Sequence, residues 1–408
     1  MRNKNNDLLT GLLNMAEAML LCGSEVSRVE DTIIRMGLAY GAEHMNVFVI
    51  TSCIIVTMGM PEGEELTQTR RITRALGTDF VKLEEFNKLS RRCCAGEVPA
   101  ELLETKVKEI EHFRQRRLNA YLGSLLAASG FAVFFGGTLA DAALVGVFAL
   151  LISWLQEKLL PISMNQLSFN LICSIIIGCL TGICTGFLPM LHLDKILIGY
   201  IMLLIPGITL TNAVRNILVG NTISGVMRLV EALLWATALA LGFMIAMFFT
   251  GVNYDLVNAV TPSVLTQLIT AGVGSLGFAM MFNVRRGLLA QAVLGGILDW
   301  GVYLLASAFF DGNVFLSSVA AAVFATIYAE TMARIMKAPA TIFYLPTVVP
   351  LIPGGSLFYT MSYAVIQEWS MVRSYGASTL YCALGIAAGM SLVLSVAYTA
   401  RRLMRSQN

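Results

Sequence analysis

The segment Leu204-Ile205-Pro206-Gly207 recurs 147 residues later as Leu351-Ile352-Pro353-Gly354. The same ungapped offset aligns Gly130-Phe131-Ala132 with Gly277-Phe278-Ala279, and it aligns Ala240 and Gly242 with Ala387 and Gly389. One offset that matches three separate clusters indicates an internal duplication, because chance matches between apolar segments would not share a single spacing. The sequence therefore predicts two similar halves, each interrupted by one Pro-Gly pair.

Composition points to a membrane protein. The chain has 408 residues, of which 56% are hydrophobic and 13% are charged, whereas about 25% of a soluble domain is charged. Residues 1–117 hold 33 of the 54 charges. The first segment therefore has the composition of a soluble domain, and the remainder has the composition of membrane-spanning helices. The net charge of +2 favours no charged partner, and balanced charges in the first segment argue against nucleic-acid binding.

Ten stretches are apolar and long enough to be candidate membrane spans. They cover residues 118–136, 138–155, 168–188, 195–218, 229–250, 263–282, 287–306, 314–333, 341–366 and 379–400. With the first segment in the cytoplasm, thirteen basic residues fall in inside connections and only Lys195 and Arg373 fall outside. This asymmetry predicts that both termini are cytoplasmic.

Each half contains five predicted spans, so the second half must enter the membrane in the opposite orientation to the first. Inverted repeats of this kind build many secondary transporters. The predicted fold is a mainly α membrane protein with about ten transmembrane helices in two inverted five-helix repeats, preceded by a small cytoplasmic α+β domain. The predicted domains are 1–115 (cytoplasmic), 116–252 (first repeat) and 253–408 (second repeat with a short basic cytoplasmic tail).

The two Pro-Gly pairs predict the solute site. Proline removes a helical hydrogen bond, and polar groups freed in lipid must be satisfied by protein, water or ligand. A polar face follows each break and suits a small polar solute, although an ordinary kink is the simpler alternative for either break alone. The candidate substrate-binding residues are Pro206, Gly207, Thr209, Asn212, Arg215, Pro353, Gly354, Ser356 and Tyr359.

Three acids within the spans are candidates for proton coupling, because carboxylates inside a membrane are functional candidates by default. Asp299 lies deep in its span and has no local partner, which favours a transport role. Glu231 and Glu330 have an arginine three or four residues away on the same helix, so an interfacial ion pair is at least as good an interpretation. Eight cysteines without CxxC spacing predict reduced thiols, and the sequence predicts no cofactor, no metal and no catalytic site.

The soluble segment carries a polar motif, Gly23-Ser24-Glu25-Val26-Ser27-Arg28-Val29-Glu30-Asp31-Thr32, followed by Tyr40-Gly41 and Thr69-Arg70-Arg71. On residues alone the motif is either a ligand site or a salt-bridged helix face. Its members of interest are Glu25, Arg28, Glu30, Asp31, Thr32, Arg70 and Arg71. This motif resembles the N-terminal domain of the threonine/serine exporter family, and the two Leu-Ile-Pro-Gly segments are similar to that family's membrane part.

The resemblance covers nearly the whole chain. It implies a multi-pass exporter of threonine and serine in a bacterial plasma membrane, driven by the proton-motive force, with protons and the lipid bilayer as further partners. Relatives with the two halves on separate chains are implicated in dicarboxylate export, so a succinate-like dicarboxylate is the first alternative substrate. A membrane-anchored enzyme that uses the N-terminal domain is the second alternative, and a channel or structural assembly protein is the third. Whether the chain forms a homo-oligomer is left open.

Overall fold

The computed structural model describes residues 2–61, 63–73, 77–113, 117–160, 165–188, 190–218, 220–251 and 261–406. The predicted boundary residues 115 and 116, and 252 and 253, lie outside this description. The chain divides into two compact units. The first comprises Met1–Arg116 with Phe282–Arg285, and the second comprises Arg117–Met281 with Arg286–Asn408.

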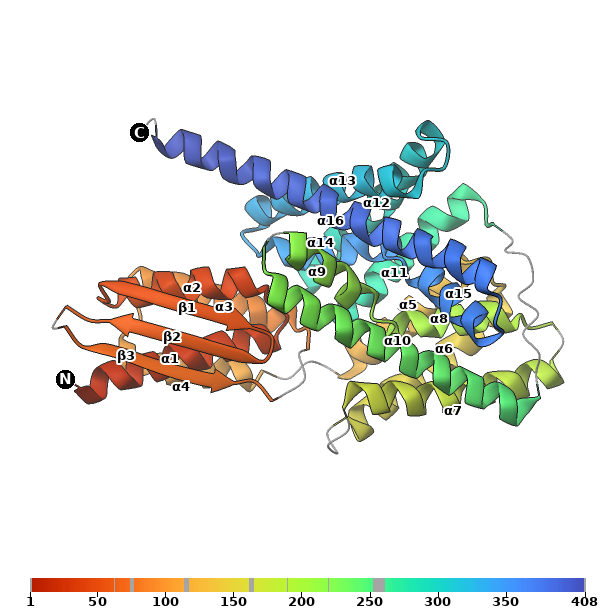
Figure 1. Ribbon diagram of the computed structural model, residues 1–408, viewed down its shortest axis with the longest axis horizontal. Coiled ribbons are helices and arrows are strands. Elements are labelled where there is room, and N and C mark those ends of the chain that lie inside the picture. Colours follow the sequence, from red (N-terminus) through yellow and green to blue (C-terminus); the bar gives the residue numbers. More distant parts are fainter. Residues whose placement is uncertain are drawn as a thin grey trace. The chain divides into compact units, whose positions relative to one another are not determined.

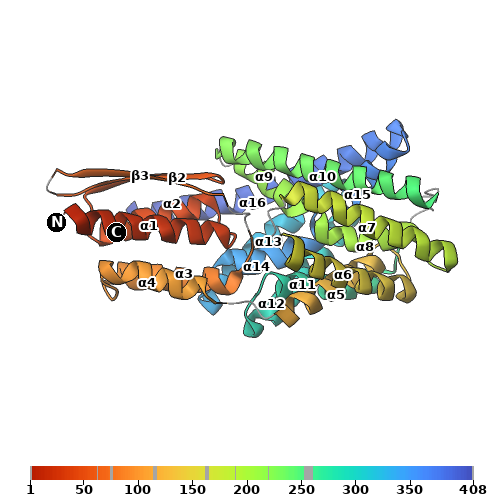
Figure 2. The same cartoon turned by 90° about the horizontal axis from the view of Figure 1, so that it is seen from below.

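The first unit is an α+β domain with an antiparallel sheet of order β1-β2-β3 (Figure 1). Its elements are α1 (Arg2–Leu21), α2 (Val26–Ala39), β1 (His44–Ile50), β2 (Cys53–Gly59), β3 (Glu65–Arg71), α3 (Phe80–Cys94) and α4 (Ala100–Glu111). Figure 2 shows three layers, with the sheet over α1 and α2 and these two helices over α3 and α4. The small domain expected from the sequence is therefore present.

Buried and exposed side chains alternate along β2, which explains how the sheet covers α1. Ile54, Val56 and Met58 on β2 are fully buried, whereas Ile55 between them is 36% exposed. Successive side chains of a strand point to opposite faces, so one face of β2 packs against helices and the other faces outward. Helix α1 lies inside the layers, and its Leu9 and Leu12 are completely buried.

The tetrapeptide 282–285 belongs to the first unit, although the sequence predicts that it ends one span and leads into the next. The Phe80 amide donates to the Phe282 carbonyl at 2.9 Å, and the two phenyl rings meet edge to face at 5.7 Å. Asn283 donates from Nδ2 to Oδ1 of Asp79 at 2.8 Å, and the same carboxylate caps α3 by accepting from the Lys82 amide. These four residues therefore pack within the first unit, where they complete the start of α3, although the segments before and after them belong to the second unit.

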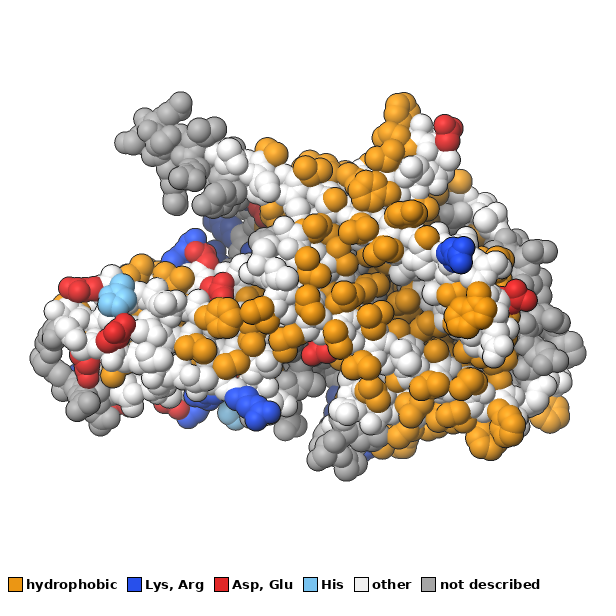
Figure 3. Space-filling view, viewed as in Figure 1, with side chains coloured by type: hydrophobic (Ala, Val, Ile, Leu, Met, Phe, Trp, Pro, Cys, Tyr) orange, Lys and Arg blue, Asp and Glu red, His pale blue; other side chains and the backbone are white. Residues whose placement is uncertain are grey.

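The second unit is entirely helical in its described residues. Its helices are α5 (Arg117–Phe134), α6 (Leu139–Leu159), α7 (Gln166–Phe187), α8 (Leu193–Leu204), α9 (Gly207–Leu218), α10 (Thr222–Thr250), α11 (Val264–Met281), η1 (Arg286–Leu288), α12 (Leu289–Phe309), α13 (Val314–Met336), α14 (Ala340–Val348), η2 (Val349–Leu351), α15 (Gly354–Val365) and α16 (Trp369–Ser406). Figure 3 shows apolar side chains spread over the visible face of this unit. In this unit Leu233, Leu241 and Leu380 are each about half exposed, as expected of a surface that lipid covers.

The described residues contain seven helices that are long and apolar enough to cross a membrane, or nine if each of two bent helix pairs counts as one span. This number is lower than the ten spans predicted. The predicted span at 118–136 corresponds to α5, which forms a helix of 18 residues but is not among the seven. Its first turn carries Arg117 and Asn119, which make that turn polar.

Helix boundaries repeat at the same spacing as the sequence clusters. Helices α11, α14, α15 and α16 begin 147 residues after α5, α8, α9 and α10, respectively. Contacts between helices correspond as well, because α7 packs on α10 as α13 packs on α16, and α9 packs on α16 as α15 packs on α10. The two halves of the second unit therefore share the spacing of these helix starts and these helix neighbours.

Helices α5 and α11, which correspond under this offset, cross each other at glycines. A methyl group on Gly277 would collide with the Ala127 backbone and would lie 2.7 Å from the Gly123 carbonyl oxygen. A methyl group on Gly130 would lie 3.2 Å from the Gly274 amide nitrogen. Small residues allow two helix backbones to approach this closely in a membrane.

We predict that Gly277→Ala forces α5 and α11 apart, because the obstructing atoms are backbone atoms that cannot rotate away. Overpacking of this kind costs about 1–3 kcal/mol. Thermal unfolding of the detergent-solubilised full-length protein should show a lower midpoint. The matched control is Gly186→Ala in α7, where a methyl group would meet no atom within 4 Å. Equal midpoints for the two variants would contradict the close crossing.

Candidate functional site

Two helices of the second unit are broken at the predicted Pro-Gly pairs. The axes of α8 and α9 differ by 52°, and those of the α14–η2 segment and α15 differ by 46°. Pro206 and Pro353 have no amide hydrogen, so neither can donate to the carbonyl four residues earlier. The Val349 carbonyl instead accepts the Ile352 amide in a tighter turn at 3.2 Å. Each break therefore has a direct covalent cause in the sequence.

The two breaks pack directly on each other. A methyl group on Gly207 would collide with the Ile352 side chain, and one on Gly354 would collide with Met202 and lie 3.4 Å from Ile205. Under the 147-residue offset Gly207 corresponds to Gly354, and Ile205 corresponds to Ile352. The contact is therefore reciprocal, with the glycine of each break against the isoleucine of the other.

The predicted substrate-binding residues surround this crossing at different depths. Pro206, Gly207, Pro353 and Gly354 are buried, as is Arg215, while the remaining four are partly exposed: Thr209, Asn212, Ser356 and Tyr359. The structure thus brings the two Pro-Gly pairs together and continues each into a helix that carries the polar residues.

Side chains of α16 contact the polar residues of α15. Thr379 of α16 donates to the Ser356 hydroxyl at 3.0 Å, and the Ser356 hydroxyl donates weakly to the Pro353 carbonyl at 3.3 Å. The Tyr359 ring lies 5.1 Å from the ring of Tyr375, also on α16. The hydroxyl groups of the second broken helix are therefore held by its neighbour.

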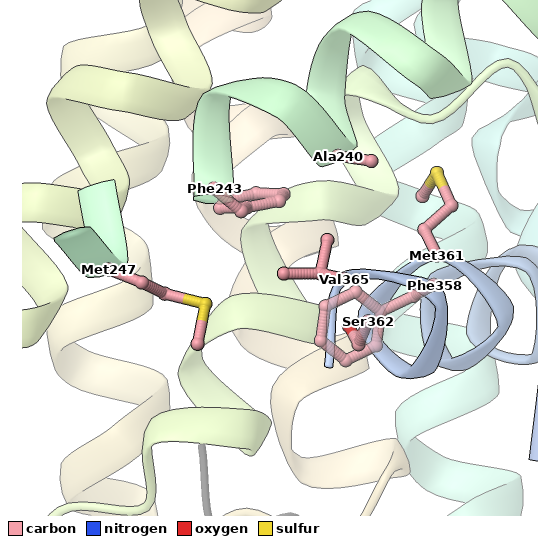
Figure 4. Close-up of a pocket in the computed structure, with 7 residues that line it drawn as sticks. All are labelled: Ala240, Phe243, Met247, Phe358, Met361, Ser362 and Val365. Atoms are coloured by element: carbon pink, nitrogen blue, oxygen red, sulfur yellow. The ribbon is translucent and has the colours of Figure 1, made fainter. Parts of the chain in front are cut away.

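A pocket lies between α10 and α15 (Figure 4). It is lined by Ala240, Phe243 and Met247 of α10 and by Phe358, Met361, Ser362 and Val365 of α15. Ser362 is its one hydroxyl-bearing residue, and none of the predicted substrate-binding residues lines it. This lining suits an apolar group, so the pocket is a neighbour of the second broken helix rather than the predicted polar site.

Sequence reasoning missed a buried ion pair at the start of α8. Asp194 and Lys195 lie 2.7 Å apart, and each side chain is 5% exposed. Tyr359 of α15 lies within electrostatic range of Asp194. The sequence analysis placed Lys195 in an outside connection, but the structure buries it. The sequence signal that could have predicted this pair is two adjacent opposite charges in the first turn of an otherwise apolar helix.

A second polar network lies before the same helix. Asp141 is completely buried at the start of α6, and its carboxylate accepts from the backbone amide of His192 at 2.9 Å and contacts Nδ1 of His192 at the same distance. It also accepts from the Thr138 amide, which completes a capping box. The carboxylate therefore fixes the segment that leads into α8.

The three predicted acids have different surroundings. Asp299 on α12 is 0% exposed, and neither carboxylate oxygen has a hydrogen-bond partner among the described residues. Glu231 and Arg228 lie three residues apart on α10 and act on each other electrostatically. Glu330 is partly exposed near the end of α13.

Members of the N-terminal motif take separate partners. Glu30 accepts the Val49 amide of β1 at 3.0 Å, and burial raises the pKa of its carboxyl above the usual range, although this hydrogen bond opposes the rise. Asp31 pairs with Arg35 at the surface, and Arg70 pairs with Glu17 of α1 at 3.2 Å. The Glu30 hydrogen bond joins α2 to β1, and the Arg70–Glu17 ion pair joins β3 to α1.

The remaining motif residues lie apart. Arg71 is exposed and follows Arg70 on β3, so the two side chains point to opposite faces of the sheet. Glu25 is the boundary residue at the start of α2, and Arg28 and Thr32 lie partly exposed on that helix. Thr69 and Arg71 therefore share one face of the sheet, and Arg70 lies on the other.

Apolar helices, a lipid-compatible surface and two reciprocal helix breaks define a multi-pass membrane protein with the features of a transporter. Comparison with known proteins agrees. The family profile described as "Putative threonine/serine exporter" matches residues 11–250, and the profile described as "Threonine/Serine exporter, ThrE" matches residues 267–396. The chain belongs to the threonine/serine exporter family.

Two relatives are similar over almost the whole chain. A "Threonine/serine exporter" of Corynebacterium glutamicum is 24% identical, with 97% of this chain and 84% of the relative covered. A "Probable threonine/serine exporter" of Mycobacterium tuberculosis (strain ATCC 25618 / H37Rv) is 22% identical, with 96% and 77% covered. No solved structure matches the chain.

We predict that Lys195→Met strongly destabilises the second unit, because it leaves the Asp194 carboxylate buried without its counter-ion. Breaking a buried pair in this way costs about 3–5 kcal/mol, and the double variant Asp194→Asn/Lys195→Met should recover most of the loss. The control is Arg117→Met, which removes the Arg117–Glu157 pair of 2.9 Å whose arginine is 76% exposed. Thermal midpoints of the full-length protein measure all three. A loss for Lys195→Met no larger than that for Arg117→Met would contradict the structural role of the pair.

Proposed function

We propose that the protein is a secondary active exporter of threonine and serine that works by alternating access around its two broken helices. Membership of the exporter family and the names of the relatives support the class of solute. The observation that carries the mechanism is the reciprocal contact of the two breaks, Gly207 on Ile352 and Gly354 on Ile205. Substrate sites of secondary transporters lie at such interfaces between repeats.

The two halves act as inverted five-helix repeats in this proposal. Equal spacing of helix starts and corresponding helix contacts support the duplication. If α5 spans the membrane with the others, each half contains five spans, and an odd number reverses the second half. The protein then lies in a bacterial plasma membrane with both termini in the cytoplasm, as the distribution of basic residues favours.

The broken helices supply groups that match a zwitterionic amino acid. Helices α9 and α15 begin at Gly207 and Gly354, so their first amides can hold the solute carboxylate. Thr209 and Asn212 on α9 and Ser356 on α15 hydrogen-bond the remaining polar atoms of the solute.

Two further residues complete the proposed site. Arg215 attracts the carboxylate near the cytoplasmic mouth, and Tyr359 closes the site from α15. A dicarboxylate would need more than one cation, and the candidate residues include only one basic side chain, which favours an amino acid.

Alternating access follows from the reciprocal contact. Because each glycine lies against the isoleucine of the other break, one half can rock against the other about this crossing and expose the site first to one side and then to the other. Protons drive the cycle, with Asp299 as the carrier in the second half. Glu231 and Glu330 lie on α10 and α13, where they relay protons toward the ends of the helices.

Efflux from cells tests the solute and the driving force together. Cells that express the protein and are preloaded with radiolabelled threonine, serine or succinate should lose threonine and serine faster than cells without it, and should retain succinate. A protonophore should slow this efflux. Efflux that a protonophore leaves unchanged would contradict proton driving, and selective loss of succinate would contradict the amino-acid substrate.

Replacing the two prolines tests the broken helices. Pro206→Ala/Pro353→Ala restores two helical amides, so it straightens the breaks and displaces the groups that hold the solute. We expect threonine efflux to fall roughly 10- to 100-fold while membrane insertion, measured by surface labelling, is retained. The control is Pro339→Ala, because Pro339 precedes α14 and interrupts no helix. Wild-type efflux from a correctly inserted double variant would contradict the site.

A further inference from the structure

Two hydroxyl groups from different helices lie against one face of α12. Gly295, Gly296 and Asp299 share this face because they are three or four residues apart. A methyl group on Gly295 would collide with the Thr347 hydroxyl of α14, and one on Gly296 would collide with the Ser275 hydroxyl of α11. The two glycines therefore admit both hydroxyls within one helical turn of the Asp299 carboxylate.

These oxygens are buried and unsatisfied. Ser275, Asp299 and Thr347 are each 0% exposed. Within the part of the chain that the structure describes, Ser275 Oγ, Thr347 Oγ1 and both carboxylate oxygens of Asp299 lack a hydrogen-bond partner. Burying such groups without partners is costly, most of all for an ionised carboxylate. The groups also make no hydrogen bond to one another, so a ligand between them would satisfy all of them at once.

The surroundings of the carboxylate lack positive charge. The Cys382 thiol of α16 acts on it electrostatically, Tyr303 follows it by one turn on α12 and acts on the same thiol, and the Tyr328 ring of α13 lies beside Gly295. The Tyr328 hydroxyl donates to the Gln291 carbonyl at 2.7 Å, and the thiol donates to the Leu351 carbonyl at 3.2 Å. Among the described residues no basic side chain acts on Asp299. A positive charge at this position must therefore come from a ligand.

The corresponding place in the first half has the opposite character. The 147-residue offset replaces Ser275, Gly295, Gly296, Asp299 and Thr347 by Ala128, Phe148, Ala149, Ile152 and Tyr200, respectively. All five of these first-half residues belong to one buried hydrophobic cluster. The Phe148 and Tyr200 rings pack edge to face at 6.3 Å, where the second half has a glycine and a threonine. The duplication therefore preserved the helices but exchanged an apolar cluster for a polar one.

We propose that Ser275, Asp299 and Thr347 form a binding site for one small monovalent cation, and that only the second half of the chain carries it. The inference rests on the proposed function, since it makes this site the coupling site of the exporter. An amino acid does not fit where a single methyl group on α12 would already collide with each hydroxyl. A proton and a sodium ion are the monovalent cations that are small enough.

Prolines next to Thr347 supply a further oxygen. Pro350 has no amide hydrogen, so it leaves the carbonyl of Pro346 without its helical donor. Backbone carbonyls freed in this way coordinate coupling ions in other transporters with broken helices. The site lies directly before the second break, so cation binding can act on the same segment that holds the solute.

A bound cation would neutralise the carboxylate. While the Asp299 carboxylate is ionised and unpaired, its buried charge opposes movement of α12 relative to the neighbouring helices. When the bound cation neutralises the carboxylate, this opposition is removed. One site in one half predicts one cation for each transport cycle.

The test uses purified full-length protein in liposomes preloaded with threonine. Efflux is measured with an imposed pH gradient in sodium-free buffer, and separately with an imposed sodium gradient at equal pH on both sides. Threonine exchange without any gradient is measured in parallel, because exchange reports a folded, substrate-binding protein independently of coupling. The gradient that accelerates wild-type efflux identifies the cation.

Asp299→Asn should abolish the acceleration by the gradient while threonine exchange continues. Ser275→Ala and Thr347→Val should each raise the cation concentration for half-maximal efflux about 5- to 10-fold, because each removes one ligand oxygen worth about 1 kcal/mol. The matched controls are Ser317→Ala and Thr326→Val, whose buried hydroxyls donate to carbonyls of their own helix. These controls should leave the half-maximal concentration unchanged.

Failure of this inference and failure of the proposed function give different results. If wild-type efflux responds to a gradient and Asp299→Asn responds equally, the cation site is overturned and coupled export stands. If both hydroxyl variants behave as their controls do, Ser275 and Thr347 are not ligands and the site as proposed is overturned. If wild-type efflux responds to neither gradient, coupled export itself is overturned, and the coupling site with it.

Discussion

The constraint on which the second unit depends is the absence of water around a membrane-spanning backbone. Each Pro-Gly break removes helical hydrogen bonds, and lipid cannot replace them. The broken segments must therefore face protein or solute, and here the two breaks face each other through Gly207 and Gly354. A side chain at either position would collide with the other broken helix, with Ile352 in the case of Gly207 and with Met202 in the case of Gly354. A buried crossing with loosened backbone follows from this arrangement, and such a crossing is where polar solutes bind in transporters.

The two halves of the second unit have similar helices but different chemistry. Helix starts and helix contacts correspond between the halves, whereas the ionisable residues do not. Asp299 replaces an apolar Ile152, and the buried Asp194–Lys195 pair corresponds to Thr341 and Ile342. The first half thus buries an adjacent pair of opposite charges, and the second half buries the Asp299 carboxylate without a hydrogen-bond partner among the described residues. Each half keeps the backbone geometry of the other while it supplies a different chemical environment.

Much of the fold was predictable because it depends on local or periodic features. Hydrophobic stretches predicted most of the helices of the second unit, and Pro206 and Pro353 predicted its two breaks. Helix α5 was expected as a tenth span, but it falls outside the helices that are apolar enough by themselves. Its neighbours α6, α8 and α11 cover it, and such coverage cannot be read from one segment. Arg70 and Arg71 follow each other in the sequence but point to opposite faces of the sheet, because side chains alternate along a strand.

The sequence by itself determined the two halves, the positions of their breaks and the division into soluble and membrane segments, because proline chemistry, hydrophobic length and the repeat offset are properties of the chain. Only the tertiary structure decided which groups meet. It placed Gly207 against Ile352, buried Lys195 with Asp194, and brought Ser275 and Thr347 from two helices to the face of Asp299. It also assigned residues 282–285 to the soluble unit through Phe80 and Asp79. Contacts between distant segments depend on how helices pack, and no local pattern in the chain encodes that packing.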